Sequence, residues 1–196
     1  MNVGKYWDIN QEFYKAKFEK ALDYKSYLNT GIDRERSRWQ AIYDRVILTD
    51  EQRRLLGSFK RKMNVLCMSS LSCGDCVRQC PILARISEAS ELIDLRFLDR
   101  DLNPDLSEKL RILGGARVPV VVFLSEDFFE FMRFGDRTLS TYRKMAQEQI
   151  GSACPAGIIP PPEHELAVIT QEWVDMFERV QLGLRLSPML RERYSD

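Results

Sequence analysis

The sequence predicts an α/β fold in which a mixed sheet carries helices on both of its faces. Between residues 62 and 149, short apolar runs of strand length alternate with segments of helical periodicity. The first two predicted strands are joined by a helix, which favours a parallel pair with a right-handed crossover. The last two are nearly contiguous, which favours an antiparallel hairpin. The expected order of this core is β-α-β-α-β-β-α, with helical extensions before and after it.

The elements of the core follow from local patterns. Four short runs have the apolar content and length of strands: residues 62–68, 92–99, 118–124 and 128–134. The third run, VPVVVFL, is continuously apolar and should be central, whereas the fourth alternates as a strand with one wet face does. Three segments are predicted as helices: residues 73–90, a stretch from Asn103 as its N-cap to about Leu113, and a stretch that Thr138 opens.

Both flanks of the core are predicted to be helical. Residues 1–61 carry aromatic and apolar side chains at helical spacing, and Thr49 with Gln52 three residues later forms a capping box. Residues 150–162 (IGSACPAGIIPPP) are a connector rich in proline and glycine. Residues 163–196 contain a helix whose apolar side chains recur at steps of three or four, and we expect this stripe to pack on the core.

Charge and hydropathy exclude several classes of function. The chain of 196 residues has 29 basic and 29 acidic side chains, so no basic surface for nucleic acid is expected. It has no apolar run long enough to cross a membrane and no signal peptide at its start. We therefore expect a cytoplasmic protein without a nucleic-acid or membrane partner. Because thiols in that compartment are kept reduced, closely spaced cysteines indicate catalysis or metal binding rather than structural disulfides.

The segment SCGDCVRQCP, residues 72–81, carries the chemistry of the chain. Cys73 and Cys76 form a C-x-x-C pair between a predicted buried strand and the start of a helix. Two intervening residues on a first helical turn bring the sulfurs within bonding reach, and the helix N-terminus favours a thiolate on Cys73. The strand–helix junction should leave Cys73 exposed and place Cys76 deeper. An exposed nucleophile backed by a resolving thiol is what thiol–disulfide exchange requires.

Residues 62–149 resemble thioredoxin. The CGDC motif is similar to the thioredoxin active-site motif CGPC, and Pro81 follows the second cysteine at the distance of the proline inside the thioredoxin helix. Pro119 matches the cis-proline that faces the active site, and Gly135 matches a glycine late in the fold. With the segments LDRDLNP and GGARVPVVVFL and the two helical flanks, the chain more closely resembles a bacterial thioredoxin-like family.

The resemblance implies a role for each of these residues. Cys73 would attack a partner disulfide and Cys76 would resolve the mixed disulfide, while Val118 and Pro119 would position the partner backbone. The residues that would tune the motif are Ser72, Gly74 and Asp75, and those with a structural role are Pro81 and Gly135. The implied activity is that of a thiol–disulfide oxidoreductase whose partners are a protein disulfide and a reductant. Its redox group would be the Cys73–Cys76 disulfide, with no cofactor and no metal.

Three departures from thioredoxin bear on this activity. Ser72 stands where thioredoxin has a tryptophan, which removes an aromatic surface for partners. Cys67 stands where thioredoxin has a buried aspartate that is linked to proton transfer at the resolving thiol. Asp75 replaces the proline of the motif, and a carboxylate beside the sulfurs should oppose a thiolate at Cys73. We therefore expect exchange chemistry with an unusual reduction potential.

Two other functions are compatible with the same residues. The protein is a non-enzymatic adaptor or redox sensor if its helical extensions bind a partner and the CGDC motif oxidises as a switch. It is a metal or iron–sulfur protein if Cys73, Cys76 and Cys80, the last of which precedes a proline, are joined by Cys67 or Cys154 as a fourth ligand. We favour core packing for Cys80 and Cys67, a loop position for Cys154 and a solvated position for the single histidine, His164.

Overall fold

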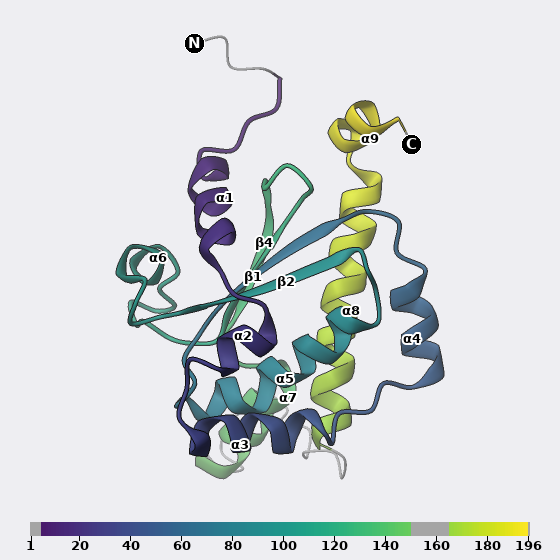
Figure 1. The fold of residues 1–196 in the computed structure, drawn as a ribbon. Helices are drawn as coiled ribbons and strands as arrows, with labels where there is room; N and C mark the ends of the chain where they lie inside the picture. The colour runs from purple at the N-terminus through teal and green to yellow at the C-terminus, as the bar shows by residue number, and fades with distance from the viewer. Residues whose placement is uncertain (1–4, 150–164, 196) are drawn as a thin grey trace.

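The computed structural model describes residues 5–149 and 165–195. Within them, four strands form one mixed sheet in the order β2-β1-β3-β4 (Figure 1). The strands are β1 (Met63–Ser69), β2 (Ile93–Asp99), β3 (Val120–Leu124) and β4 (Glu130–Gly135). Strand β1 pairs in parallel with β2 and antiparallel with β3, which pairs antiparallel with β4. The predicted parallel pair and the predicted hairpin are therefore confirmed.

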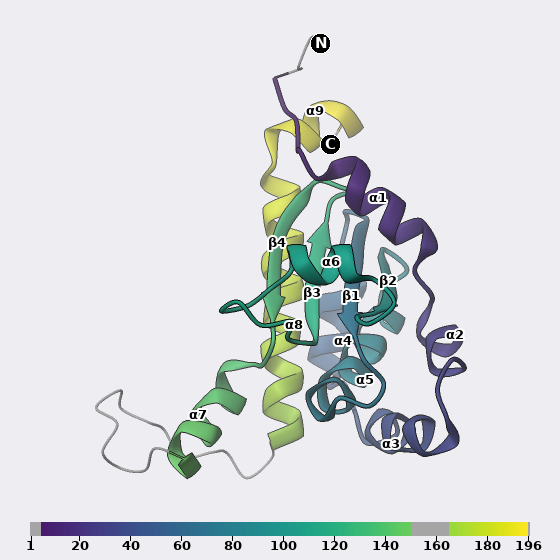
Figure 2. The ribbon, with the colours of Figure 1, turned by 90° about the vertical axis from the view of Figure 1, so that its left-hand side faces the viewer.

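Helices cover both faces of this sheet, as predicted. The helices of the described residues are α1 (Gln11–Lys20), α2 (Tyr24–Leu28), α3 (Asp33–Tyr43), α4 (Asp50–Gly57), α5 (Gly74–Glu88), α6 (Pro104–Lys109), α7 (Leu139–Gln149), α8 (Glu165–Leu186) and α9 (Pro188–Tyr194). Helix α6 lies on one side of the sheet, whereas α4, α5 and α8 lie on the other (Figures 1 and 2). The predicted connector at residues 150–162 lies outside the described residues.

The N-terminal helices share a core with the edge of the sheet. Leu22, between α1 and α2, forms an antiparallel bridge with Phe97 of β2 through two backbone hydrogen bonds of 3.0 and 2.7 Å. The ring of Phe97 stacks on that of Tyr27 and contacts Trp39 edge-on, and all three side chains are buried. Because an open strand edge is a ready template for unwanted pairing, this bridge protects the β2 edge.

Helix α8 packs its apolar stripe against the other half of the sheet. The ring of Trp173 meets Phe134 of β4 edge-on at 5.1 Å, and the ring of Phe177 meets Phe123 of β3 in the same way at 5.2 Å. Both α8 side chains are buried. They are four residues apart and therefore point from the same face of the helix. The predicted stripe is thus a core contact.

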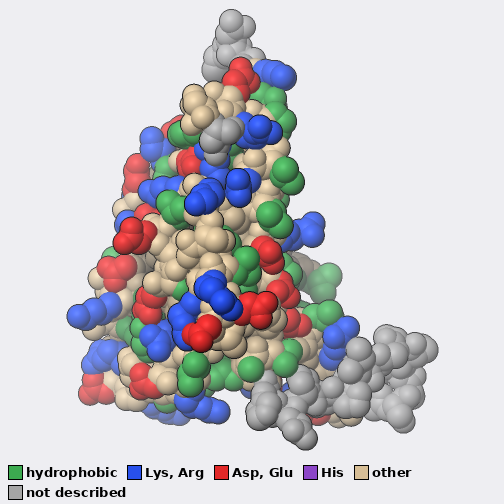
Figure 3. Space-filling view, turned by 90° about the vertical axis from the view of Figure 1, so that its right-hand side faces the viewer, with side chains coloured by type: hydrophobic (Ala, Val, Ile, Leu, Met, Phe, Trp, Pro, Cys, Tyr) green, Lys and Arg blue, Asp and Glu red, His purple; other side chains and the backbone are tan. Residues whose placement is uncertain are grey.

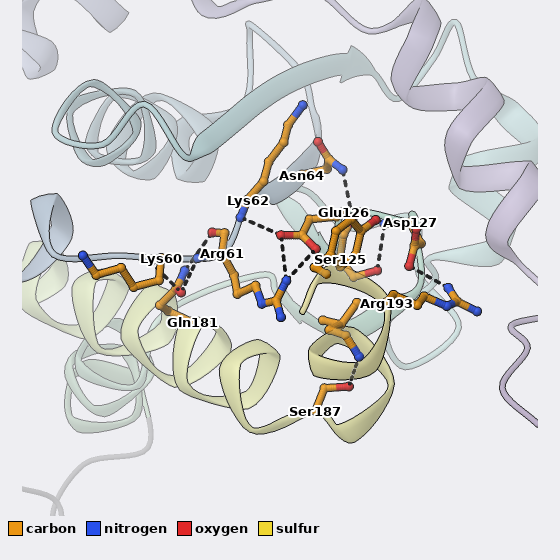
Figure 4. A network of polar contacts seen from close by, with 12 residues as sticks. Lys60, Arg61, Lys62, Asn64, Ser125, Glu126, Asp127, Gln181, Ser187 and Arg193 are labelled. Carbon is orange, nitrogen blue, oxygen red and sulfur yellow. Dashed lines mark hydrogen bonds and ion pairs between the residues drawn. The ribbon is translucent and has the colours of Figure 1, made fainter. Parts of the chain in front are cut away.

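A polar network ties α8 and α9 to the start of β1 and to the turn between β3 and β4 (Figure 4). We call it the C-terminal clamp, and its residues are Arg61, Glu126, Asp127, Gln181 and Arg193. Nη1 of Arg61 lies 3.3 Å from Oε2 of Glu126, and the Arg61 side chain is 3% exposed. The Gln181 amide accepts a hydrogen bond from the Arg61 N–H and donates one to the Arg61 carbonyl. Arg193 of α9 pairs with Asp127 at 2.6 Å.

The second helix of the core is shorter than predicted. We expected it to run to about Leu113, but α6 ends at Lys109. Leu113 has a φ of 49° and Gly114 a φ of 72°, both in the left-handed region, and Ile112 and Gly115 exchange backbone hydrogen bonds of 3.0 Å. The chain therefore closes a tight turn here, because these left-handed conformations cannot continue a right-handed helix.

Asn103 stands at the N-cap position of α6, as predicted, but its side chain makes no capping hydrogen bond. Its Nδ2 instead donates to the carbonyl of Asp99 at 2.9 Å, and its Oδ1 accepts from Nζ of Lys17 at 3.1 Å. The side chain therefore joins the end of β2 to helix α1 rather than stabilising α6.

The surface carries charges of both signs. On the face that Figure 3 shows, acidic and basic side chains are intermixed over the whole area, which agrees with the equal numbers of the two kinds in the sequence. Among the helices of residues 5–149 and 165–195, none combines the length and the hydrophobicity that crossing a bilayer requires.

The C-terminal clamp generates a stability prediction. Glu126→Gln removes the carboxylate that faces the buried Arg61 guanidinium, and we expect a loss of about 2 kcal/mol in the free energy of unfolding, because a hydrogen bond between two charged and largely buried groups is weakened. Urea unfolding of the full chain measures it. Glu108→Gln is the matched control, since Glu108 pairs with Arg111 at 2.5 Å but is 65% exposed, and little change is expected. Equal effects of the two substitutions would show that the clamp contributes no more than a surface pair.

Candidate functional site

Cys73 and Cys76 lie where β1 gives way to α5. Strand β1 ends at Ser69, and Cys73 occupies the N-cap of α5 with an extended backbone, its carbonyl accepting from the N–H of Val77 at 2.9 Å. The Cys73 side chain is half-buried, whereas Cys76 is completely buried. The structure therefore places one thiol within reach of solvent and the other behind it.

The segment before β3 lies directly against Cys73. The Val118–Pro119 peptide bond is cis, and the Cys73 thiol donates a hydrogen bond to the carbonyl of Val118 at 3.6 Å. These residues are 45 positions apart in the sequence. The pairing of β1 with β3 brings them together, because both lie just beyond the paired ends of these neighbouring strands.

Gly135 allows β4 to approach this segment closely. A Cβ atom on Gly135 would lie 2.6 Å from the carbonyl oxygen of Pro119 and 3.1 Å from Cα of Val120. Both contacts are to backbone atoms, which cannot swing aside as a flexible side chain can. The structure therefore requires glycine here, at the position where the resemblance to thioredoxin predicts a structural glycine.

The other motif residues differ in their surroundings. Ser72 is exposed, and its hydroxyl lies 3.2 Å from that of Ser70. Gly74 begins α5 in open space, with no atom within 4 Å of a Cβ built on it. Pro81 lies buried inside α5, where its ring removes one backbone hydrogen-bond donor from the helix.

Arg137 is a site residue that the sequence analysis missed. Its Nη2 lies 2.6 Å from Oδ2 of Asp75, inside the CGDC motif, and its Nη1 lies 3.5 Å from Oδ2 of Asp136. Asp75 was expected to oppose a thiolate at Cys73, but the structure gives it a cationic partner. No spacing signal links positions 75 and 137, since the contact arises where the end of β4 passes the start of α5.

Asp136 anchors this part of the site. Its side chain is 3% exposed and lies 3.1 Å from Nη1 of Arg117, and it also accepts a hydrogen bond from the hydroxyl of Tyr142. Its backbone carbonyl accepts a hydrogen bond of 2.8 Å from Gln79 of α5. Burial acts to raise the pKa of Asp136, but the hydrogen bonds from Tyr142 and Arg117 outweigh it and hold the pKa below its usual value. The carboxylate is therefore charged and fixed.

The two motif thiols differ in their ionisation. The hydrogen bond with Cys76 and then burial raise the pKa of Cys73 above its ordinary value, although the N–H groups at the start of α5 act to lower it. Burial acts to raise the pKa of Cys76, but hydrogen bonds from the Cys73 and Cys80 thiols and the Ser70 backbone outweigh it and lower the pKa to about 5. We expected the lower pKa at Cys73. As a pair, the thiols lose the first proton easily and keep the second.

The remaining cysteines of the described residues are core residues. Cys67 of β1 and Cys80 of α5 are both fully buried, as predicted, and their sulfurs are 3.9 Å apart. Burial raises the pKa of Cys80. Within residues 5–149 and 165–195, no three His, Cys, Asp or Glu side chains are grouped so that they could hold a metal ion. Cys154 and His164 lie outside the described residues.

The Arg137–Asp75 pair yields a prediction about thiol reactivity. A negative charge beside a thiol disfavours its thiolate, so Arg137→Gln should move the midpoint of the pH–alkylation profile of Cys73 upward by about half a pH unit. Asp75→Asn should move it downward by a similar amount. The double variant should lie close to the wild type. Iodoacetamide labelling of the reduced protein with peptide mapping measures the midpoint, and shifts of the same sign in both single variants would contradict the assignment.

Gly135 yields a prediction about stability. Gly135→Ala places a methyl group against the Pro119 carbonyl, and we expect a loss of about 2 kcal/mol in unfolding free energy. Gly57→Ala is the control, because its Cβ would meet its nearest atom at 3.9 Å and alanine favours a helix. Thermal and urea unfolding compare the two variants. A Gly135→Ala protein as stable as the Gly57→Ala protein would show that β4 can move away from Pro119 at no cost.

The sequence and the fold were compared with those of known proteins. The sequence profile described as thioredoxin matches residues 21–149. A crystal structure of a protein of unknown function from Pseudomonas aeruginosa is similar, with a TM-score of 0.62 and 17% identity over 83% of this chain and 98% of that one. An HIV epitope-scaffold is similar, with a TM-score of 0.63 and 17% identity over 85% and 98%. A search of curated proteins finds no match. The profile spans more than half of the sequence, and the chain belongs to the thioredoxin family.

Proposed function

We propose that the protein is a thiol–disulfide oxidoreductase of the thioredoxin type that acts on protein disulfides. The observation that supports this most directly is the hydrogen bond of 3.6 Å from the Cys73 thiol to the Val118 carbonyl. It places a reachable sulfur beside the main chain that precedes Pro119. An extended partner segment that paired with this main chain would bring its own disulfide to Cys73.

The reaction would proceed in two exchange steps. In the first, Cys73 passes its proton to the Cys76 thiolate and its sulfur attacks one sulfur of the partner disulfide. A mixed disulfide forms, and the second partner sulfur leaves as a thiolate that takes this proton from Cys76. In the second, the Cys76 thiolate attacks the Cys73 sulfur, which forms the Cys73–Cys76 disulfide and releases the first partner sulfur. The partner gains two electrons and the motif loses two. A reductant of the thiol class then restores the dithiol.

The burial of the two sulfurs supports this division of roles. Cys73 is half-buried and can meet a partner, whereas Cys76 is completely buried and can meet only a sulfur already bound at Cys73. The lowered pKa of Cys76 also suits the sequence of events. Once Cys73 is bound in a mixed disulfide it needs no proton, and Cys76 is the thiol that must be ionised for the second step.

The substrate side of the site would rest on backbone groups. Val118 is 5% exposed, so its side chain offers little surface to a partner. Ser72, which is exposed, offers a hydroxyl where an aromatic ring would provide apolar contact. We therefore propose that Val118 and Pro119 position the partner main chain and that Ser72, Gly74 and Asp75 adjust the reactivity of the sulfurs.

Insulin disulfide reduction, with dithiothreitol as the electron donor, tests the proposal. We expect the wild type to accelerate precipitation of the insulin B chain and Cys73→Ser to abolish the acceleration. Cys154→Ser, which removes a thiol outside the motif, should retain it. Cys76→Ser should instead accumulate a mixed disulfide on Cys73, detectable by mass spectrometry. A wild-type rate no higher than that of Cys73→Ser would reject the oxidoreductase and favour a redox sensor or adaptor.

A further inference from the structure

Helices of the N-terminal extension contact the segment that leads into the CGDC motif. Strand β1 ends at Ser69, and Cys73 is the N-cap of α5. The N–H of Cys73 donates to the carbonyl of Ser70 at 3.1 Å, so the chain makes a tight turn between the strand and the helix. Helix α3 packs against α5 (Figures 1 and 2). We call residues 69–71 the entry segment, because their position determines where α5 and Cys73 begin.

The backbone and the side chain of Leu71 both contact the N-terminal extension. Nε1 of Trp39 in α3 donates a hydrogen bond of 3.0 Å to the Leu71 carbonyl, although the two residues are 32 positions apart. Both side chains are buried, so water does not compete for this bond. Gly31, between α2 and α3, approaches the Leu71 side chain so closely that a Cβ atom on the glycine would lie 2.6 Å from Cδ1.

Tyr27 of α2 makes a second polar contact with the entry segment. Its hydroxyl accepts a hydrogen bond of 2.9 Å from the hydroxyl of Ser69, and both side chains are buried. Its ring stacks on that of Phe97 in β2 and meets the Trp39 ring edge-on at 5.9 Å. The two hydrogen bonds to the entry segment therefore come from aromatic side chains that are fixed by one another and by the sheet.

The entry segment in turn determines where the Cys73 sulfur lies. This thiol donates to the Val118 carbonyl at 3.6 Å, and it can keep that position only while the turn before it stays in place. A hydrogen bond that a neutral thiol donates favours the protonated form. If the entry segment were released, the sulfur could leave the carbonyl, and Cys73 would be more exposed and easier to ionise.

We propose that Trp39 and Tyr27 are positioning residues, which hold the entry segment so that the Cys73 sulfur stays against the Val118 carbonyl. The N-terminal extension is then a working part of the redox site. This proposal deepens the proposed function and rests on it, because the place beside Val118 is where the partner main chain would meet Cys73. Neither aromatic residue touches a reacting atom, since both act through residues 69–71.

Alkylation of the cysteines tests the proposal without a disulfide substrate. The reduced full-length protein is treated with iodoacetamide at neutral pH, and peptide mapping gives the rate at each cysteine. We expect Trp39→Phe to raise the rate at Cys73 about fivefold, which corresponds to the loss of one hydrogen bond of ordinary strength. Tyr27→Phe, which removes a single oxygen atom, should raise it about twofold. Cys67 and Cys80 are completely buried and should stay unlabelled.

The chain offers a matched control for each variant. Trp173→Phe makes the same change at another fully buried tryptophan, whose Nε1 has no hydrogen-bond partner among the described residues. Tyr24→Phe removes a buried hydroxyl from the helix that carries Tyr27, and in the described part of the chain this hydroxyl has no partner either. Neither control releases the entry segment, so we expect both to leave the Cys73 rate at its wild-type value.

Two outcomes would overturn the proposal. One is a Trp39→Phe protein, folded by circular dichroism, in which Cys73 is labelled at the wild-type rate. The other is a rise that Trp173→Phe matches or that Cys67 and Cys80 share, which would indicate a general loosening of the fold. If Trp39→Phe does not fold, the comparison of Tyr27→Phe with Tyr24→Phe decides the matter, because neither of these changes leaves a cavity the size of a ring.

Insulin reduction separates this proposal from the proposed function. Trp39→Phe should reduce insulin about fivefold more slowly than the wild type, because a displaced sulfur no longer meets the partner beside Val118. Faster alkylation together with slower insulin reduction is a combination that a general loss of stability does not produce. A wild type that is inactive toward insulin would reject the oxidoreductase, whereas the alkylation rates would still decide whether Trp39 positions Cys73.

Discussion

The burial of β1 on both of its edges is the constraint on which the site depends. All seven residues of the strand are buried, and it pairs with β2 on one side and β3 on the other. A shift of one residue in either register would turn every side chain to the opposite face, so the register is fixed. Because Met68 pairs with Val120, the turn to Cys73 must lie beside Val118. The contact between the thiol and this carbonyl follows from the pairing of two core strands.

The negative charges at the site are balanced by two arginines, one just before β3 and one just after β4. Asp75 brings a negative charge next to the sulfurs, and Arg137 compensates it at 2.6 Å. Arg117 compensates the buried Asp136 in the same way. Each carboxylate therefore has a guanidinium partner that offsets part of its negative charge.

The sequence predicted what local patterns determine. The strands are apolar runs, the C-x-x-C pair is a fixed spacing, and Pro119 and Gly135 stand at matching offsets, so all could be placed before the structure was known. The contact of Arg137 with Asp75 and that of Cys67 with Cys80 could not be predicted. Each joins two elements that are far apart in the sequence, and so depends on how these elements pack together. The early end of α6 was missed because leucine is a good helix former, and nothing in the sequence indicates that Leu113 adopts a left-handed backbone conformation.

The cysteines differ in burial, from the partly exposed Cys73 to the buried Cys76, Cys80 and Cys67. Cys73 is the one thiol of the described residues that is not fully buried, so it is the one sulfur among them that another molecule could reach. The two site arginines already have partners, Arg117 with Asp136 and Arg137 with Asp75. Ser72 adds no aromatic surface. If the proposed function holds, a partner would be recognised mainly through its main chain, which depends little on its sequence, and the buried Cys76 would control how quickly the partner is released.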